Sequence, residues 1–101
     1  MSATDELWTL VKRIPPGRVA SYGKLGRALP NPVSGLIVGK WMARAPGDVP
    51  WWRVVASEGT LPVHRRDPGL AAAQAACLRR EGTPFREDGR VDMSIEWEPD
   101  A

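Results

Sequence analysis

Residues 14–25 read IPPGRVASYGKL, and this stretch divides the first part of the chain into two helices. The Pro-Pro-Gly run at 15–17 ends any helix that precedes it, because proline lacks an amide donor and glycine is a poor helix former. Residues 18–20 are a short extended segment, and Ser21 after them is a favoured N-cap. The stretch therefore predicts a helix, a sharp break and a second helix.

The helix before the break is predicted over residues 4–13. Its apolar residues recur at i, i+3, i+4 and i+7, which places them on one helix face. They are Leu7, Leu10, Val11 and Ile14. Ser2 followed by Asp5 resembles a capping box, with aspartate in place of the usual glutamate or glutamine.

After the break, helices are predicted over residues 22–29 and 33–44, separated by the Pro-Asn-Pro run at 30–32. Two short helices joined in this way are a helix-turn-helix candidate, although helical hairpins with a purely structural role are commoner. In the second of these helices, Gly35 and Gly39 leave one face without side chains. A neighbouring backbone or a ligand can approach such a face closely.

Residues 48–55 read DVPWWRVV and predict a stiff turn that leads into a short buried strand. Two adjacent indoles do not easily share one side of an irregular segment. We expect one of Trp51 and Trp52 to pack inward and the other to line a cleft; the alternative is that both are core or lid residues. A small β-hairpin is predicted over residues 54–61.

A fourth helix is predicted over residues 68–80, with Asp67 as its cap and Gly82 as its stop. Strand-like pieces follow around Phe85 and at residues 90–93, with an Asp-Gly turn between them.

The acidic tail, about residues 94–101, is expected to be loose. Neither a repeat nor a linker interrupts the sequence. Residues 1–101 are therefore expected to form a single domain, α+β and mostly helical.

The chain has one cysteine, Cys77, so no disulfide forms within it, and a cytoplasmic location is expected. The residues after Met1 form no long apolar run, so neither a signal peptide nor a membrane partner is expected. With His64 as the only imidazole, no metal site is expected, and no phosphate-binding loop suggests a nucleotide cofactor. Cys77 is interpreted as a small buried side chain rather than a nucleophile.

Charge is divided unequally between the two halves. Residues 1–52 carry seven basic and three acidic side chains, whereas residues 53–101 carry seven arginines and nine acidic side chains. A basic half suits a polyanion such as nucleic acid, and ordinary solubility charge is the alternative. The His-Arg-Arg run at 64–66 is either a solvated loop or a phosphate contact.

Residues 14–25 resemble the helix-turn-helix entry of the O6-alkylguanine-DNA alkyltransferases. Val38-Gly39, Pro50-x-x-Arg53-Val54-Val55 and Ser57-x-Gly59 resemble the recognition helix, active-site loop and following hairpin of that family. The resemblance covers about residues 5–83. With tryptophan at the nucleophile position and no preceding domain, the chain resembles the alkyltransferase-like proteins. This implies a winged-helix-like helix-turn-helix domain with a small β-hairpin that binds double-stranded DNA.

The resemblance also implies a mode of action. Family members place the recognition helix in the minor groove and rotate an alkylated guanine into a pocket beside the Pro-x-x-Arg loop. The transferases move the alkyl group to a cysteine that is followed by a histidine, and these two positions hold Trp51 and Trp52 here. We therefore expect no alkyl transfer. The chain is expected to act as a monomer that flags O6-alkylguanine for nucleotide excision repair proteins.

Carried over residue by residue, the resemblance assigns two groups. The DNA-binding group is Tyr22, Ser21, Ser34, Leu36, Gly39 and Lys40. The lesion-pocket group is Trp51, Trp52, Arg53, Val54 and Ser57. Tyr22 matches the tyrosine that presses the phosphate, and Arg53 matches an arginine with a structural role.

Two positions depart from the pattern. Leu36 stands where the family has an arginine finger; leucine can wedge between base steps but cannot hydrogen-bond the orphaned base. Trp52 stands where alkyltransferase-like proteins keep histidine, and it either crowds the pocket or widens its stacking surface. The alternative function is therefore a degenerate family member, a general DNA-binding or protein-interaction module without lesion recognition.

Overall fold

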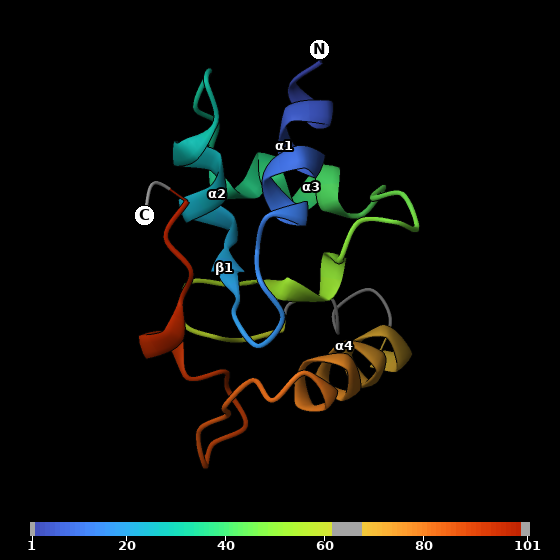
Figure 1. Ribbon diagram of the computed structural model, residues 1–101, viewed down its shortest axis with the longest axis vertical. Coiled ribbons are helices and arrows are strands. Elements are labelled where there is room, and N and C mark those ends of the chain that lie inside the picture. Colours follow the sequence, from blue (N-terminus) through green and yellow to red (C-terminus); the bar gives the residue numbers. More distant parts are fainter. Residues whose placement is uncertain (1, 62–67, 100–101) are drawn as a thin grey trace.

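The computed structural model describes residues 2–61 and 68–99 (Figure 1). In this part of the chain the elements are α1 (Ala3–Lys12), β1 (Ala20–Ser21), α2 (Tyr22–Ala28), α3 (Gly35–Met42), the 3-10 turn η1 (Trp51–Arg53), β2 (Val54–Val55), α4 (Pro68–Arg80) and the 3-10 turn η3 (Met93–Ile95). All four predicted helices are present, with ends that differ from prediction by at most two residues. The predicted mostly helical α+β class is confirmed.

The helices lie at two ends of the molecule. Figure 1 shows α1, α2 and α3 grouped at one end and α4 at the other, with β1, η1 and β2 crossing between them. A larger buried cluster lies among the first three helices and includes Leu7, Ile14, Leu25, Val38 and Val54. A smaller cluster lies toward α4 and consists of Val19, Val55, Leu78 and Val91.

The capping box predicted at the start of α1 is present. The Ser2 hydroxyl accepts from the Asp5 amide at 3.1 Å, and the Asp5 carboxylate accepts from the Ser2 amide at 3.4 Å. At its far end α1 stops before residues 15–17, as the prolines predict.

Strand pairing differs from the prediction. β2 pairs in parallel with β1, with Ala20 opposite Val54 and Ser21 opposite Val55. The turn expected after β2 is present, since the Ala56 amide donates to the Thr60 carbonyl at 3.1 Å. However, no second strand follows that turn within the described part of the chain. The predicted hairpin over residues 54–61 is therefore a turn without a ladder, because burial on both faces of β2 favours a partner in the interior.

The end of α4 and the segment after it agree with the prediction. The Thr83 amide donates to the Leu78 carbonyl and the Gly82 amide to the Arg79 carbonyl, both at 3.0 Å, which is a Schellman motif. Phe85 and Val91 then form an isolated antiparallel bridge, which confirms the strand-like pieces at these two residues, whereas Met93 already begins η3. None of the described helices is long and apolar enough to span a membrane.

The C-terminal residues are not loose, which corrects the expectation for 94–99. Glu96 forms a parallel bridge with Val19, and the Trp97 amide donates to the Val19 carbonyl at 2.7 Å. The Trp97 ring packs against the larger cluster, and the Arg13 guanidinium lies 5.5 Å from its centroid. A sequence rich in acidic residues is ordered here because a tryptophan anchors it and cations face it. Residues 100–101 lie outside the described part.

Glycine at position 59 is required by both backbone and packing. Gly59 has φ +87°, and an added Cβ would lie 2.3 Å from the Val91 carbonyl oxygen. Gly82 is a matched control, because it has φ +83° but an added Cβ would meet no described atom within 4 Å. We predict that Gly59→Ala lowers the free energy of unfolding by about 3 kcal/mol or more and Gly82→Ala by about 1 kcal/mol.

Urea unfolding of the two variants checks this prediction. Equal losses in Gly59→Ala and Gly82→Ala would show that the contact between residues 59 and 91 contributes nothing beyond backbone strain.

Candidate nucleic-acid interface

The first turns of α2 and α3 pack backbone against backbone. A Cβ added at Gly35 would lie 3.0 Å from the Gly23 amide nitrogen, so the two helices meet where neither carries a side chain. This confirms the close approach predicted for the glycine face, at Gly35. Each helix has a serine N-cap: the Ser21 hydroxyl accepts from the Lys24 amide, and the Ser34 hydroxyl from the Ile37 amide.

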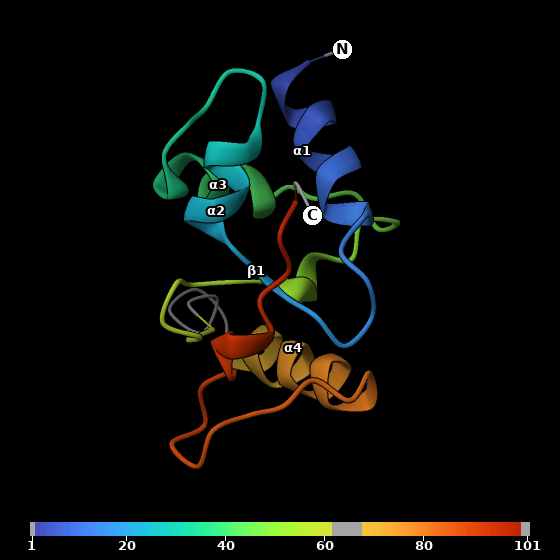
Figure 2. The same cartoon turned by 60° about the vertical axis from the view of Figure 1, so that its left-hand side comes forward.

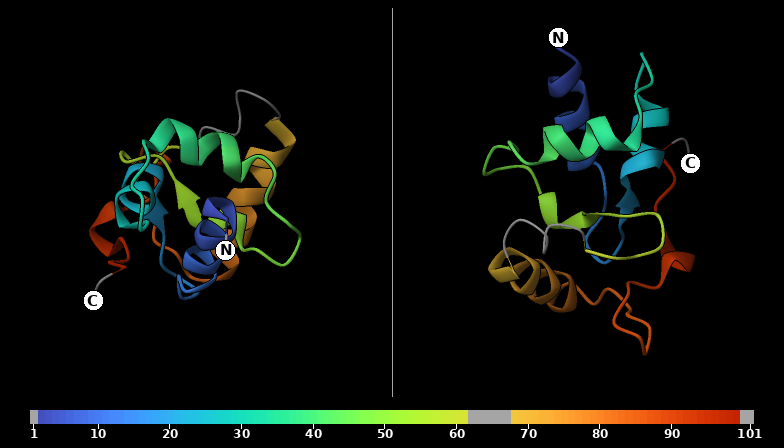
Figure 3. Two further views of the ribbon diagram at one scale, coloured as in Figure 1. Left: turned by 90° about the horizontal axis from the view of Figure 1, so that it is seen from above. Right: turned by 180° about the vertical axis from the view of Figure 1, so that it is seen from behind.

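The outward face of α3 has little side-chain cover. Leu36 is 72% exposed, and Lys40 one turn later is also exposed. Between them, a Cβ added at Gly39 would meet no described atom within 4 Å. Figure 3 shows α3 lying across the face seen from behind. This face therefore presents one apolar side chain, one cation and bare backbone.

The other predicted DNA-binding residues lie around this face. Ser34 is exposed, and Tyr22 is half-buried against the larger cluster. Ser21 is buried, with its hydroxyl used in the cap of α2. Ser21 is thus buried, whereas the other five residues are exposed or half-buried, and contact of all six with DNA stays a prediction.

The cations of the first half divide into two groups. Lys12 pairs with Asp48 at 2.8 Å, and Lys24 pairs with Glu96 and Glu98. Arg13 and Arg18 donate to carbonyls of the C-terminal segment. The second group is Arg27, Lys40 and Arg44, which are exposed and form no ion pair with any described residue. Among the cations of the first half, those free to meet a polyanion therefore lie on and just beyond α2 and α3.

The two tryptophans of η1 face different clusters. Their ring centroids are 6.1 Å apart and the ring planes meet at 84°. Trp51 packs against the larger cluster and Trp52 against the smaller one, and both are half-buried. The expected division into one inward and one cleft-lining indole is therefore not observed. Each ring joins a cluster and keeps part of its surface exposed.

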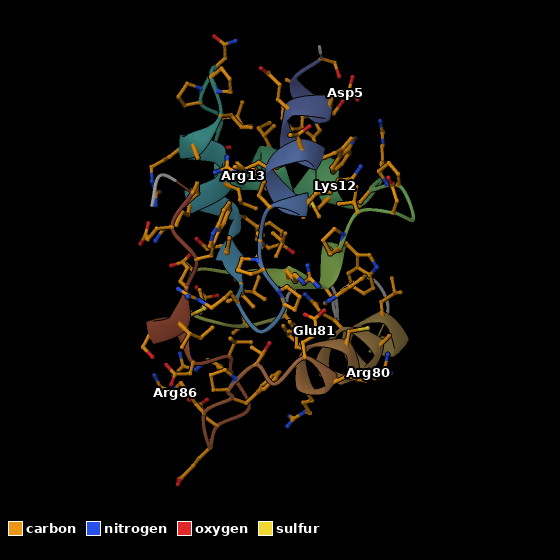
Figure 4. All side chains as sticks on the ribbon, viewed as in Figure 1. Asp5, Lys12, Arg13, Arg80, Glu81 and Arg86 are labelled. Atoms are coloured by element: carbon orange, nitrogen blue, oxygen red, sulfur yellow. The ribbon has the colours of Figure 1, made fainter. Side chains whose placement is uncertain are left out.

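Arg53 fastens this loop to two distant segments. Its guanidinium forms a two-point bond with the Glu81 carboxylate, at 3.0 and 2.6 Å, and donates to the Ile14 carbonyl at 2.9 Å. Figure 4 shows Glu81 at α4, on the side of the helix that faces the middle of the molecule. Hydrogen bonding to Arg53 holds the pKa of the Glu81 carboxyl below its usual value. The structural role predicted for Arg53 agrees with these contacts.

The indole N–H of Trp52 has an unusual environment. It is buried and meets no acceptor at hydrogen-bond geometry within the described part of the chain. It nevertheless lies near enough to Glu81 to favour the charged carboxylate and help lower its pKa. The Arg53 guanidinium lies 5.6 Å from the Trp52 ring centroid. Trp52 therefore lies beside the Arg53 guanidinium, and its indole N–H makes no hydrogen bond to the described residues.

The remaining predicted pocket residues have different settings. Val54 is buried in the larger cluster, and its carbonyl accepts from the Gln74 amide in a buried hydrogen bond. Ser57 lies in the exposed turn, and its hydroxyl donates to Glu58. Cys77 is half-buried on α4, more exposed than predicted. The described residues contain no metal-ligand cluster, and residues 64–66 lie outside the described part.

Over residues 2–83 the sequence matches the family described as 6-O-methylguanine DNA methyltransferase, DNA binding domain. The chain belongs to this family. It is 28% identical to the DNA base-flipping protein of Vibrio parahaemolyticus, over 93% of this chain and 94% of that one. It is 31% identical to the DNA base-flipping protein of Escherichia coli, over 91% of this chain and 70% of that one.

Among solved structures, the fold is similar to that of S. pombe Atl1 in complex with damaged DNA containing O6-carboxymethylguanine. The TM-score is 0.80 at 27% identity, and the match covers 95% of this chain and 94% of Atl1. The family resemblance read from the sequence is thereby confirmed.

Three residues that support the site of this alkyltransferase-family domain were missed from sequence. Gln74 is 2% exposed, and its amide donates to the carbonyls of Trp52 and Val54 at 3.1 and 3.0 Å. Glu81 and Glu96 bind Arg53 and Ser21. A glutamine at the inward position four residues before Leu78 was the available signal for Gln74. The sequence contains no comparable signal for the two glutamates, because their partners are distant in sequence.

Glu81 should make stability depend on pH. Because its folded-state pKa is lowered, its contribution is present above the unfolded pKa, near 4.5, and is lost as pH falls through the folded pKa. We predict that Glu81→Gln lowers the free energy of unfolding by about 2 kcal/mol at pH 7, with the gap from wild type narrowing below pH 4.5.

Urea titrations from pH 7 to pH 3 measure this gap. Glu58→Gln is the control, since that carboxyl also has a lowered pKa, through its hydrogen bond with Thr60, but is fully exposed. A gap for Glu81→Gln that stays constant with pH would contradict the prediction.

Proposed function

We propose that this protein is a non-enzymatic DNA-damage sensor. It binds duplex DNA that contains O6-alkylguanine, rotates the damaged base out of the stack and marks it for repair. The observation that carries the proposal is the α2–α3 surface, where Leu36 is 72% exposed and Arg27, Lys40 and Arg44 are exposed without an ion pair to any described residue. Relatives named DNA base-flipping proteins and the likeness to Atl1 bound to damaged DNA support it.

The shape of α3 favours the minor groove. That groove is about 6 Å wide, too narrow for a helix with large side chains all round. The bare backbone at Gly39 lets α3 approach the groove, and Lys40 reaches a phosphate at its edge. Leu36 is placed to enter the base stack as an apolar wedge, as side chains of other minor-groove proteins do.

The two indoles receive the rotated base. Extruding a base costs a few kcal/mol. Stacking on an aromatic side chain returns about 1–3 kcal/mol per base. Trp51 and Trp52 present ring surface at right angles to each other, and Arg53 and Gln74 hold their backbone in place. The loop is thus rigid before the base arrives, which lowers the entropy lost on binding.

The protein binds DNA without alkyl transfer in this proposal, because Trp51 and Trp52 stand at the positions that the family resemblance assigns to the reactive cysteine and histidine. An indole is not a nucleophile, and its N–H is not a general base near neutral pH. The Glu81 carboxylate, near Trp52, is already committed to Arg53. Removal of the lesion is then left to another system, and nucleotide excision repair acting in the cytoplasm on a complex with one monomer fits this role.

Titration with paired duplexes tests the proposal. We predict at least tenfold tighter binding to a duplex with one O6-methylguanine than to the same duplex with guanine, read from tryptophan fluorescence. Mass spectrometry after incubation should show unchanged protein. Equal affinities would reject lesion sensing, absence of binding at low salt would reject DNA binding, and a mass gain of one methyl group would reject the non-enzymatic assignment.

The three uncommitted cations should set the salt dependence. Each phosphate contact changes the slope of log K against log salt by about −0.9. We therefore predict that Lys40→Ala or Arg44→Ala reduces the slope by about 1 and weakens binding to modified and unmodified duplexes alike. Arg18→Ala is the control, since its guanidinium already binds the Ile95 and Glu96 carbonyls.

Fluorescence anisotropy titrations at about 50 to 200 mM salt measure these slopes, because the salt dependence of DNA affinity is large over roughly this range. The same loss of slope in Arg18→Ala as in Lys40→Ala would show that the cations are not divided as the structure indicates.

A further inference from the structure

The C-terminal segment 95–99 runs beside β1. Glu96 bridges Val19 in parallel, and the Trp97 amide donates to the Val19 carbonyl at 2.7 Å. β1 therefore has a neighbour on each side, with β2 on the other. Figure 2 shows the segment passing in front of β1 and continuing toward α2.

The Glu96 carboxylate binds the start of α2 directly. One oxygen accepts from the Ser21 amide at 2.8 Å, and the other lies 3.3 Å from the Lys24 ammonium. The side chain is 17% exposed. Glu98 differs in each respect, since it contacts Lys24 but not Ser21 and is 61% exposed. Glu96 thus fixes the residue where β1 becomes α2, and Glu98 does not.

Movement at this point would reach both helices of the proposed interface. Tyr22 follows Ser21 directly and is the first residue of α2. Gly23 comes next and carries the backbone contact with Gly35 at the start of α3. A shift of the first turn of α2 therefore displaces Tyr22 and the base of α3 together.

We propose that Glu96 is a positioning residue for DNA binding, which sets the first turn of α2 and, through the contact between Gly23 and Gly35, the first turn of α3. This inference rests on the proposed function. According to this inference, the acidic Glu96 favours DNA binding, because the gain from positioning α2 and α3 is larger than the electrostatic repulsion between its carboxylate and the phosphates.

Charge alone gives the opposite expectation. Removing either glutamate makes the protein more positive, so simple electrostatics predicts tighter DNA binding for both changes. The positioning role instead predicts that Glu96→Ala weakens DNA binding, whereas Glu98→Ala does not. Glu98→Ala is therefore the matched control for Glu96→Ala, because the two residues share the partner Lys24 and the same charge.

Anisotropy titrations with the modified and unmodified duplexes measure the difference. Glu98→Ala should bind as tightly as wild type or up to about threefold more tightly. Glu96→Ala should bind about tenfold more weakly, with an unchanged salt slope because no phosphate contact is lost. Glu96→Gln should fall between wild type and Glu96→Ala, since its amide oxygen still accepts from Ser21.

A double-mutant cycle with Tyr22→Ala shows whether Glu96 acts through the first turn of α2. The effect of Glu96→Ala should shrink at least threefold when Tyr22 is already absent, whereas a general loss of stability would add independently. Circular dichroism at the titration temperature establishes whether each variant is folded. If Glu96→Ala is not folded, the DNA affinity of Glu96→Gln tests the inference instead.

Three results would overturn the inference: Glu96→Ala binding as tightly as Glu98→Ala, Glu96→Gln binding as tightly as wild type or more tightly, or additive effects in the cycle. Failure of the wild-type protein to bind either duplex at low salt would reject the proposed function instead.

Discussion

The two-point bond between Arg53 and Glu81 is the constraint on which the remaining structure depends. It joins the loop with the two tryptophans to the end of α4, and the third guanidinium bond reaches the Ile14 carbonyl just after α1. The two side chains are only 13% and 16% exposed, so an unpaired charge at either position would be costly. A chain of 101 residues has a small core, and here one part-buried ion pair connects the two hydrophobic clusters across the middle of the molecule.

The same domain uses its cations in two ways. Arg13, Arg18 and Lys24 bind the C-terminal segment and hold it beside β1, so they serve folding. Arg27, Lys40 and Arg44 are uncommitted and serve the proposed interface. Net charge hides this division. The basic first half of the sequence is partly explained by an acidic tail that it binds within the same molecule, and only the remainder is available to DNA.

In the proposed function, the loop with the two tryptophans binds a base at the positions that the family resemblance assigns to a reactive pair. The backbone is held by Gln74 and Arg53, and neither contact involves the indole rings as partners. The scaffold therefore tolerates aromatic rings at the two positions that the family resemblance assigns to the reactive pair. In the proposed function, the two rings supply stacking area for a base and no thiol stands at these positions, so DNA is bound without alkyl transfer.

The sequence by itself determined the four helices, the serine caps of the first two, the stop of α4 at Gly82 and the family, because capping, helix periodicity and short motifs are local signals. It also placed Leu36, Gly39 and Lys40 on one helix, where the structure leaves them together on the outward face. Only the tertiary structure decided the parallel partner of β2, the anchoring of residues 95–99, the burial of Ser21 and the roles of Gln74, Glu81 and Glu96. Each of these features depends, directly or through burial, on contacts between residues at least 20 positions apart in the sequence. Loop closure brings such residues together without leaving a local pattern in the sequence.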